Sequence, residues 1–298
     1  MHEWILKLPF KTGRAMSDNR VSGFSPSGWI SGTVDNTLQQ KGSISVLPPL
    51  PAGTIILGLT VLPIHLYSND PHPEPFPGLQ TNFTTDGRGF ILSAEPYNPR
   101  DSIQFFMWQV TYGTAPAGYQ PRGWKSGVTS NASLPQKINT QISPNEAIAG
   151  VTVLPIHIYS NDPNPEPWPG LIAEFTESGS IFLSSDGTKP RDSIDWFLWQ
   201  TFLGRQGASP TRIGWNSGVT GSADLPARIN PTIPPGFGIV SVTVLPIHIY
   251  KNDPKPEPWP GLRVDFPTPQ SFTIQAVAND PRDSIDWFEW QVTYAALG

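Results

Sequence analysis

The chain has 298 residues, a formal net charge of −5 and only 14 % charged residues. This balance argues against the basic surface that binds nucleic acid or an anionic membrane, so we expect neither partner. The absence of cysteine excludes disulfides, zinc–thiolate sites and cysteine nucleophiles. With 35 Pro and 27 Gly beside 11 Trp and 15 Phe, the composition is typical of turn-rich β structure.

The N-terminal segment, MHEWILKLPFKTGRAM, lacks the apolar core of about 7–15 residues that marks a signal peptide. No stretch approaches the roughly 18 apolar residues of a membrane-spanning helix, so we expect no membrane insertion. A chain without cysteine also suits a reducing compartment. We therefore expect a cytoplasmic or non-classically secreted protein.

One sequence unit recurs three times along the chain. VLPIHLYSNDPHPEPFPGL at 61–79 returns in closely similar form at 153–171 and 244–262, and NPRDSIQFFMWQVTY at 98–112 returns at 189–203 and 280–294. Trp108, Trp199 and Trp290 are 91 residues apart each time. This period is too long for a solenoid coil or a propeller blade, so it predicts three domains, at 1–113, 114–204 and 205–298. A Gly-Trp pair opens each copy, at Gly28-Trp29, Gly123-Trp124 and Gly214-Trp215.

The strand signals follow the same order in each copy. Strands are predicted at 44–50 in the first copy, before a Pro-Ala-Gly turn, and at 229–233 in the third, before Pro-Pro-Gly. A β-branched run at 239–250 is apolar on both faces, which suits a strand buried between two layers. Pro246 removes a ladder donor from that run and should lie at a bulge or on a sheet edge.

Two further strands at 262–266 and 271–277 flank a short turn, and a long strand follows at 284–294. No segment shows helical periodicity over three turns. Five or six strands per copy predict an all-β fold of three tandem antiparallel β-sandwich domains, each of about 91 residues.

This pattern resembles the H-type lectin domain. Arg20-Val21-Ser22-Gly23 and Gly28-Trp29 match the opening of that family, residues 43–67 match its central strands, and Gly89-Phe90 with 102–112 match its closing segment. The resemblance implies six-stranded antiparallel sandwiches that assemble as trimers and bind galactose-type sugars, notably N-acetylgalactosamine, near subunit interfaces. Three copies in one chain would then form a covalent pseudo-threefold trimer.

The chain departs from the family pattern at two places. The aromatic residue that contacts sugar after Gly-Phe is matched by Tyr97 in the first copy only, because Thr188 and Asn279 stand near that place in the others. The loop at 69–78 looks like an insertion. The resemblance therefore does not carry over the identity of the sugar.

A proline-rich loop with the pattern Asn-Asp-Pro-x-Pro-Glu-Pro-aromatic-Pro-Gly is the first candidate site. Alternating prolines fix φ, so polar groups can be held rigidly without a core behind them. Acceptor oxygens beside a flat aromatic ring suit a sugar, the same oxygens could hold calcium, and the ring could instead tuck into its own domain. The candidate sugar-binding residues are Asn69, Asp70, Glu74 and Phe76; Asn161, Asp162, Glu166 and Trp168; Asn252, Asp253, Glu257 and Trp259.

The second candidate is the repeated Pro-Arg-Asp-Ser segment. Its arginine could donate to sugar hydroxyls and its aspartate accept from them. The alternative is a turn in which the aspartate caps a backbone amide while the arginine bridges to a neighbouring copy. The residues are Arg100 and Asp101, Arg191 and Asp192, and Arg282 and Asp283.

Each copy also has one histidine in an apolar strand, namely His65, His157 and His248. Around a threefold axis they could converge as a metal triad, although an imidazole in such a strand is more often a hydrogen-bonded structural residue. The fourth candidate is a polar–aromatic strand pair, expected to pack in the core or between domains rather than stack on a ligand. These pairs are Gln104-Phe105, Asp195-Trp196 and Asp286-Trp287.

No phosphate loop, HExxH motif or nucleophile elbow is present, so we expect a protein that is not an enzyme and needs no cofactor. A weak site repeated three times suits avidity. The sequence thus predicts a multivalent lectin, an agglutinin of glycans or glycoconjugates with up to three related sites, and leaves a further homo-oligomer open. The alternative is a structural phage or virus tail or fibre component whose repeats serve assembly.

Overall fold

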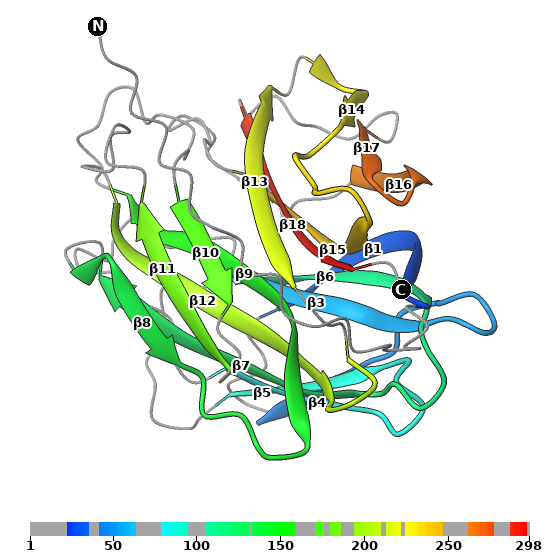
Figure 1. The fold of residues 1–298 in the computed structure, drawn as a ribbon. Helices are drawn as coiled ribbons and strands as arrows, with labels where there is room; N and C mark the ends of the chain where they lie inside the picture. Colours follow the sequence, from blue (N-terminus) through cyan, green and yellow to red (C-terminus); the bar gives the residue numbers. More distant parts are fainter. Residues whose placement is uncertain are drawn as a thin grey trace, which may run out of the picture.

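The computed structural model of the protein describes residues 23–35, 42–63, 79–94, 105–130, 133–158, 171–175, 179–185, 194–209, 213–221, 224–246, 262–276 and 287–296. These residues form eighteen β-strands and no α-helix, so the predicted all-β class is confirmed (Figure 1). Among them there is accordingly no helix long and apolar enough to cross a membrane.

Six strands fall in each copy of the repeat. The first copy has β1 (Ser25–Asp35), β2 (Ser43–Val46), β3 (Ile55–Pro63), β4 (Leu79–Phe83), β5 (Phe90–Ala94) and β6 (Phe105–Thr114). The second has β7 (Pro121–Ser130), β8 (Gln136–Asn139), β9 (Glu146–Ile158), β10 (Leu171–Phe175), β11 (Ser180–Ser185) and β12 (Ile194–Arg205). The third has β13 (Gly214–Gly221), β14 (Ala227–Ile229), β15 (Phe237–Pro246), β16 (Leu262–Thr268), β17 (Ser271–Ala276) and β18 (Trp287–Ala296).

The strands of every copy pair in the same way. The first, sixth and third strands form one antiparallel group, as in β1-β6-β3 and β13-β18-β15, and the second, fifth and fourth form another, as in β14-β17-β16. Rings from the two groups meet in the core: Phe90 of β5 packs edge-on against Trp108 of β6 with centroids 5.9 Å apart, and Phe272 repeats this contact with Trp290. Each copy is therefore sandwich-like, and a pairing of β4 with β7 joins the groups β2-β5-β4 and β7-β12-β9 into one six-stranded sheet across the first and second copies.

Proline shortens two of the predicted strands. The prediction of a strand at 229–233 is wrong beyond Ile229, because Pro231 and the following prolines offer no amide hydrogen to a ladder. In the first copy β2 likewise ends at Val46, two residues before Pro48. The prediction for Pro246 is confirmed: it ends β15, which lies at the edge of the β13-β18-β15 sheet.

Glycine in the first strand of each copy makes room for a tryptophan in the last. Gly32 pairs with Trp108 across the sheet, and a Cβ built on Gly32 would lie 2.3 Å from the indole. Gly127 and Gly218 stand in the same relation to Trp199 and Trp290. The indole thus lies flat over bare backbone, which explains why the Ser-Gly pair recurs with the tryptophan.

Buried glutamines connect the copies in cyclic order. The Gln109 side chain donates to the Val244 carbonyl at 2.5 Å and accepts from the Val244 amide at 2.9 Å, which joins the first copy to the third. Gln200 makes the same two bonds to Val61 of the first copy, and Gln291 makes them to Val153 of the second. Each amide therefore completes the outer edge of a neighbour's third strand.

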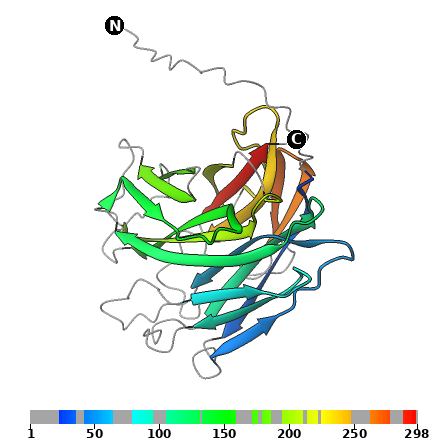
Figure 2. The same cartoon turned by 60° about the horizontal axis from the view of Figure 1, so that its bottom comes forward.

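Three threonine hydroxyls meet where the third strands of the copies converge. Thr60, Thr152 and Thr243 form a closed triangle of hydrogen bonds, with oxygens 2.7 to 3.0 Å apart. All three residues are buried. In Figure 2 the strands of the first copy (blue and cyan), the second (green) and the third (yellow to red) occupy different sides of the molecule.

The fourth strand of each copy lies against the first strand of another. β4 contacts β7, β10 contacts β13, and β16 contacts β1, so the contacts run around all three copies. The largest buried cluster accordingly contains residues of every copy, among them Val61, Phe202 and Phe288.

Candidate functional site

The loops predicted to bind sugar lie outside the described residues, so the structure does not test them. This holds for Tyr97, for the three proline-rich loops, for the three Arg-Asp pairs and for His65 and His248. His157 and Trp196 belong to described strands, but their side chains lie outside the description. Within the described part of the chain, no group of three or more acidic or histidine side chains could hold a metal ion.

A cleft of about 680 Å³ opens where the first copy meets the second. It is lined by residues of the neighbouring strands β4 and β7, which pair at Thr81 and Trp124. The turn after β8, the start of β9 and two residues of β12 complete the lining. The polar side chains that line the cleft are Gln80, Asn82, Arg122, Lys125, Asn139, Gln141 and Glu146.

Trp199 of β12, which lines the cleft, is only partly buried. Its counterparts Trp108 and Trp290 are 8 % and 9 % exposed and are covered edge-on by Phe90 and Phe272. In the second copy the register places Ile181 where the other copies have these phenylalanines. A smaller neighbour on one side and the cleft on the other leave part of this indole accessible.

Leu203 leaves the cleft open over the backbone of Gly123. In the first copy a Cβ on Gly28 would lie 2.2 Å from the Tyr112 hydroxyl, and in the third a Cβ on Gly214 would lie 2.2 Å from the Tyr294 ring. In the second copy the nearest atom to such a Cβ on Gly123 is a Leu203 methyl, at 3.6 Å. A tyrosine ring thus covers this glycine in the first and third copies but not in the second.

The rim of the cleft is held by hydrogen bonds within the second copy. The Ser143 amide donates to Oε2 of Glu146 at 3.0 Å, and Oε1 of Glu146 lies 3.7 Å from the point that a Cβ on Gly123 would occupy. Lys125 donates through Nζ to the Gln141 carbonyl, and Asn139 accepts from the Gln141 amide at 3.1 Å. Gln141 has a φ of 50°, in the left-handed region, which turns the chain back at this point.

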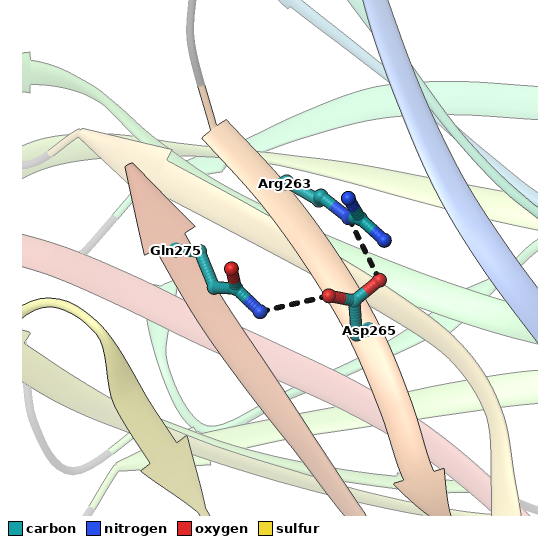
Figure 3. A network of polar contacts seen from close by, with 3 residues as sticks. All are labelled: Arg263, Asp265 and Gln275. Carbon is teal, nitrogen blue, oxygen red and sulfur yellow. Dashed lines mark hydrogen bonds and ion pairs between the residues drawn. The ribbon is translucent and has the colours of Figure 1, made fainter. Parts of the chain in front are cut away.

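The corresponding surface of the third copy is arranged differently. Arg263 and Asp265 of β16 stand at the positions of Gln80 and Asn82, and they bond to each other at 2.9 Å while Gln275 donates to the same carboxylate at 2.8 Å (Figure 3). Across the boundary on β1, Ile30 stands where Lys125 stands on β7. The polar set of the cleft is therefore not repeated at the boundary between the third and first copies.

Sequence reasoning placed its sugar-binding candidates in loops and missed Trp199, Leu203 and Glu146. One signal was visible: the repeated ending Trp-Gln-Val-Thr-Tyr changes to Trp-Gln-Thr-Phe-Leu in the second copy. No family model and no curated protein matches this chain, so the resemblance to the H-type lectin domain stays a prediction.

Proposed function

We propose that this protein is a non-enzymatic, multivalent carbohydrate-binding protein, built from three tandem six-stranded sandwich domains around a pseudo-threefold axis. The arrangement is supported by the cyclic glutamine bonds to Val61, Val153 and Val244 and by the threonine triangle. Each relation repeats from copy to copy, as rotation about one axis would require. Glycans or glycoconjugates are the proposed partners.

The observation that carries the proposal is the combination of groups in the cleft between β4 and β7. The accessible part of Trp199 offers a flat surface for the apolar face of a sugar ring. Amides of Gln80, Asn82 and Asn139 can both donate to and accept from hydroxyls, and the Glu146 carboxylate accepts. The volume of about 680 Å³ lies within the range of roughly 300–1,000 Å³ that is usual for small-ligand sites.

The test is sugar binding by the full chain and by variants at Leu203. Titration calorimetry with galactose, N-acetylgalactosamine, mannose and fucose first establishes which sugar the wild type binds. Leu203→Tyr introduces the ring that Tyr112 and Tyr294 supply in the other copies, so we expect it to fill the cleft and weaken binding at least tenfold. Because Leu203 is fully buried in the core, the thermal midpoint of the variant is measured to show that it still folds. The matched control, Leu203→Met, keeps the opening and should bind as the wild type does.

The outcomes separate the cleft from the proline-rich loops and from the rival function. If binding is lost in the double variant Trp168→Ala, Trp259→Ala but kept in Leu203→Tyr, the loops are the site and the cleft is not. If the wild type binds no sugar on a glycan array and does not agglutinate red cells, the carbohydrate proposal is wrong and the structural alternative gains support.

A further inference from the structure

We infer that the cleft between β4 and β7 selects sugars that carry a carboxylate group, with the Arg122 guanidinium as the partner of that carboxylate. This inference rests on the proposed function and names the ligand class of the same site. It depends on the charge of the cleft, on the lack of a described partner for the Arg122 side chain and on the contacts of other described arginines.

The cleft carries more positive than negative charge in a chain that is acidic overall. Arg122 and Lys125 contribute two positive charges against one negative charge from Glu146, whereas the whole chain has a formal net charge of −5. No other acidic side chain lines the cleft among the described residues. A ligand with one negative charge would therefore find a compensating excess of positive charge there.

Arg122 differs from most described arginines in having no partner within the described structure. Arg88 donates to three backbone carbonyls, Arg228 donates to the Ser271 hydroxyl at 3.5 Å, and Arg263 pairs with Asp265. Arg122 is exposed at the cleft and makes no hydrogen bond or ion pair with a described residue. A planar guanidinium in this state can bind a carboxylate through two parallel hydrogen bonds.

The other two charged side chains that line the cleft, Lys125 and Glu146, each make a hydrogen bond within the second copy. Lys125 donates to the Gln141 carbonyl and so holds the turn after β8. The Glu146 carboxylate accepts from the Ser143 amide through Oε2, which fixes its place at the start of β9. In the inferred complex, Glu146 and the amide side chains hydrogen-bond to the sugar hydroxyls. Trp199 packs against the apolar face of the sugar ring, and Arg122 binds the carboxylate of the sugar.

The experiment compares matched pairs of sugars on the full chain. Galacturonate and galactose differ only in the carboxylate at C6, and we expect galacturonate to bind about tenfold more tightly at low salt. Arg122→Met keeps the length of the side chain and removes its charge, so it should cancel that difference between the two sugars. Arg263→Met, which removes an exposed arginine from β16, is the control and should change neither affinity.

Two further arms identify the source of the carboxylate and guard against a simple anion site. A sialylated trisaccharide and an oligogalacturonate carry the same group in different sugars, and tighter binding of either one than of its neutral counterpart supports the inference. Acetate alone should not compete at millimolar concentration; if it displaces galacturonate fully, the cleft is a plain anion site and the inference is overturned.

Failure of this inference is distinguishable from failure of the proposed function. If galactose and galacturonate bind equally and Arg122→Met changes neither, the cleft is a neutral sugar site and only the carboxylate assignment is wrong. If no sugar of either kind binds, the proposed function at this cleft is wrong as well.

Discussion

Glu289 places a carboxyl group where the other copies carry apolar side chains. The register of the last strands aligns it with Met107 and Leu198, and all three residues are fully buried. Oε1 of Glu289 accepts from the Gln291 amide at 2.8 Å, while Oε2 has no partner among the described residues. Burial raises the pKa of Glu289 well above its usual value, although the Gln291 hydrogen bond opposes this. The described residues of β13 and β15, which flank β18, carry no charged side chain.

The stability of the protein should fall as the pH rises because of this carboxyl group. The unfolded chain releases the Glu289 proton near the ordinary value of 4.5, whereas the folded chain keeps it to higher pH. Its contribution is therefore full below that pH and is lost as the pH rises toward the folded pKa. We expect Glu289→Leu to stabilise the protein by about 1–3 kcal/mol at pH 8 and by less at pH 5, as measured by urea unfolding. Equal gains at both values would contradict this explanation, and Glu289→Gln tests the charge alone.

The contacts of individual side chains were harder to predict from the sequence than the strands. The sequence indicated that tryptophan and glutamine recur together, but it could not show that the glutamine amide would bond to another copy, since no local pattern distinguishes that from exposure. The sequence does show that Leu203 stands where the other two copies have a tyrosine, Tyr112 and Tyr294. Its effect on Gly123 depends on a pairing between β7 and β12 that only the structure supplies.

The edge strands β3, β9 and β15 are protected against pairing with strands of other chains. A strand at a sheet edge exposes unpaired amides and carbonyls, which invite pairing with other chains. Here the buried glutamine of a neighbouring copy occupies one such pair of groups on each strand: Val61, Val153 and Val244. The prolines at Pro63, Pro155 and Pro246 add to this protection, because a proline cannot donate to an incoming strand.

Replacing one of these buried glutamines should lower the free energy of unfolding, although none of the three lines the cleft between β4 and β7. Gln200→Leu fills a similar volume but leaves the Val61 amide and carbonyl without a partner. Each buried group left unpaired costs about 1–3 kcal/mol, so we expect a clear drop in the urea midpoint. Gln206→Leu changes an exposed glutamine a few residues further on and should have little effect. If both variants unfold at the same urea concentration, the amide does not protect the edge as described.

Periodicity and turn chemistry predicted the elements well where apolar runs were long. The strands at 262–266 and 271–277 and the apolar run starting at 239 appear as β16, β17 and β15. The short second strands were predicted poorly. Isoleucines at 229 and 233 suggested a strand, but Pro231 between them breaks the ladder, so a tertiary pairing with β17 sets where β14 ends.

At the scale of the whole molecule, each copy buries part of its surface against another copy. β16 of the third copy lies against β1 of the first, and Trp215 of the third copy packs into the cluster around Ile181 and Phe197 of the second. Shared burial of this kind couples the stabilities of the copies.

We therefore expect the full chain to unfold in one transition rather than three. Scanning calorimetry should give a calorimetric enthalpy close to the van't Hoff enthalpy for all 298 residues. A chain ending at residue 204 would lack the Gln291 cap on β9 and should melt at lower temperature or aggregate. Three separate peaks, or an unchanged melting temperature after truncation, would show that the copies fold independently.

The difference between Leu203 and the tyrosines at 112 and 294 has a consequence for how such a protein can evolve. In an assembly of identical chains, a single base change alters every subunit at once, and a change that opens one junction opens them all. Here the junctions are encoded separately, so a change such as leucine for tyrosine can alter one of them and leave the other two as they are.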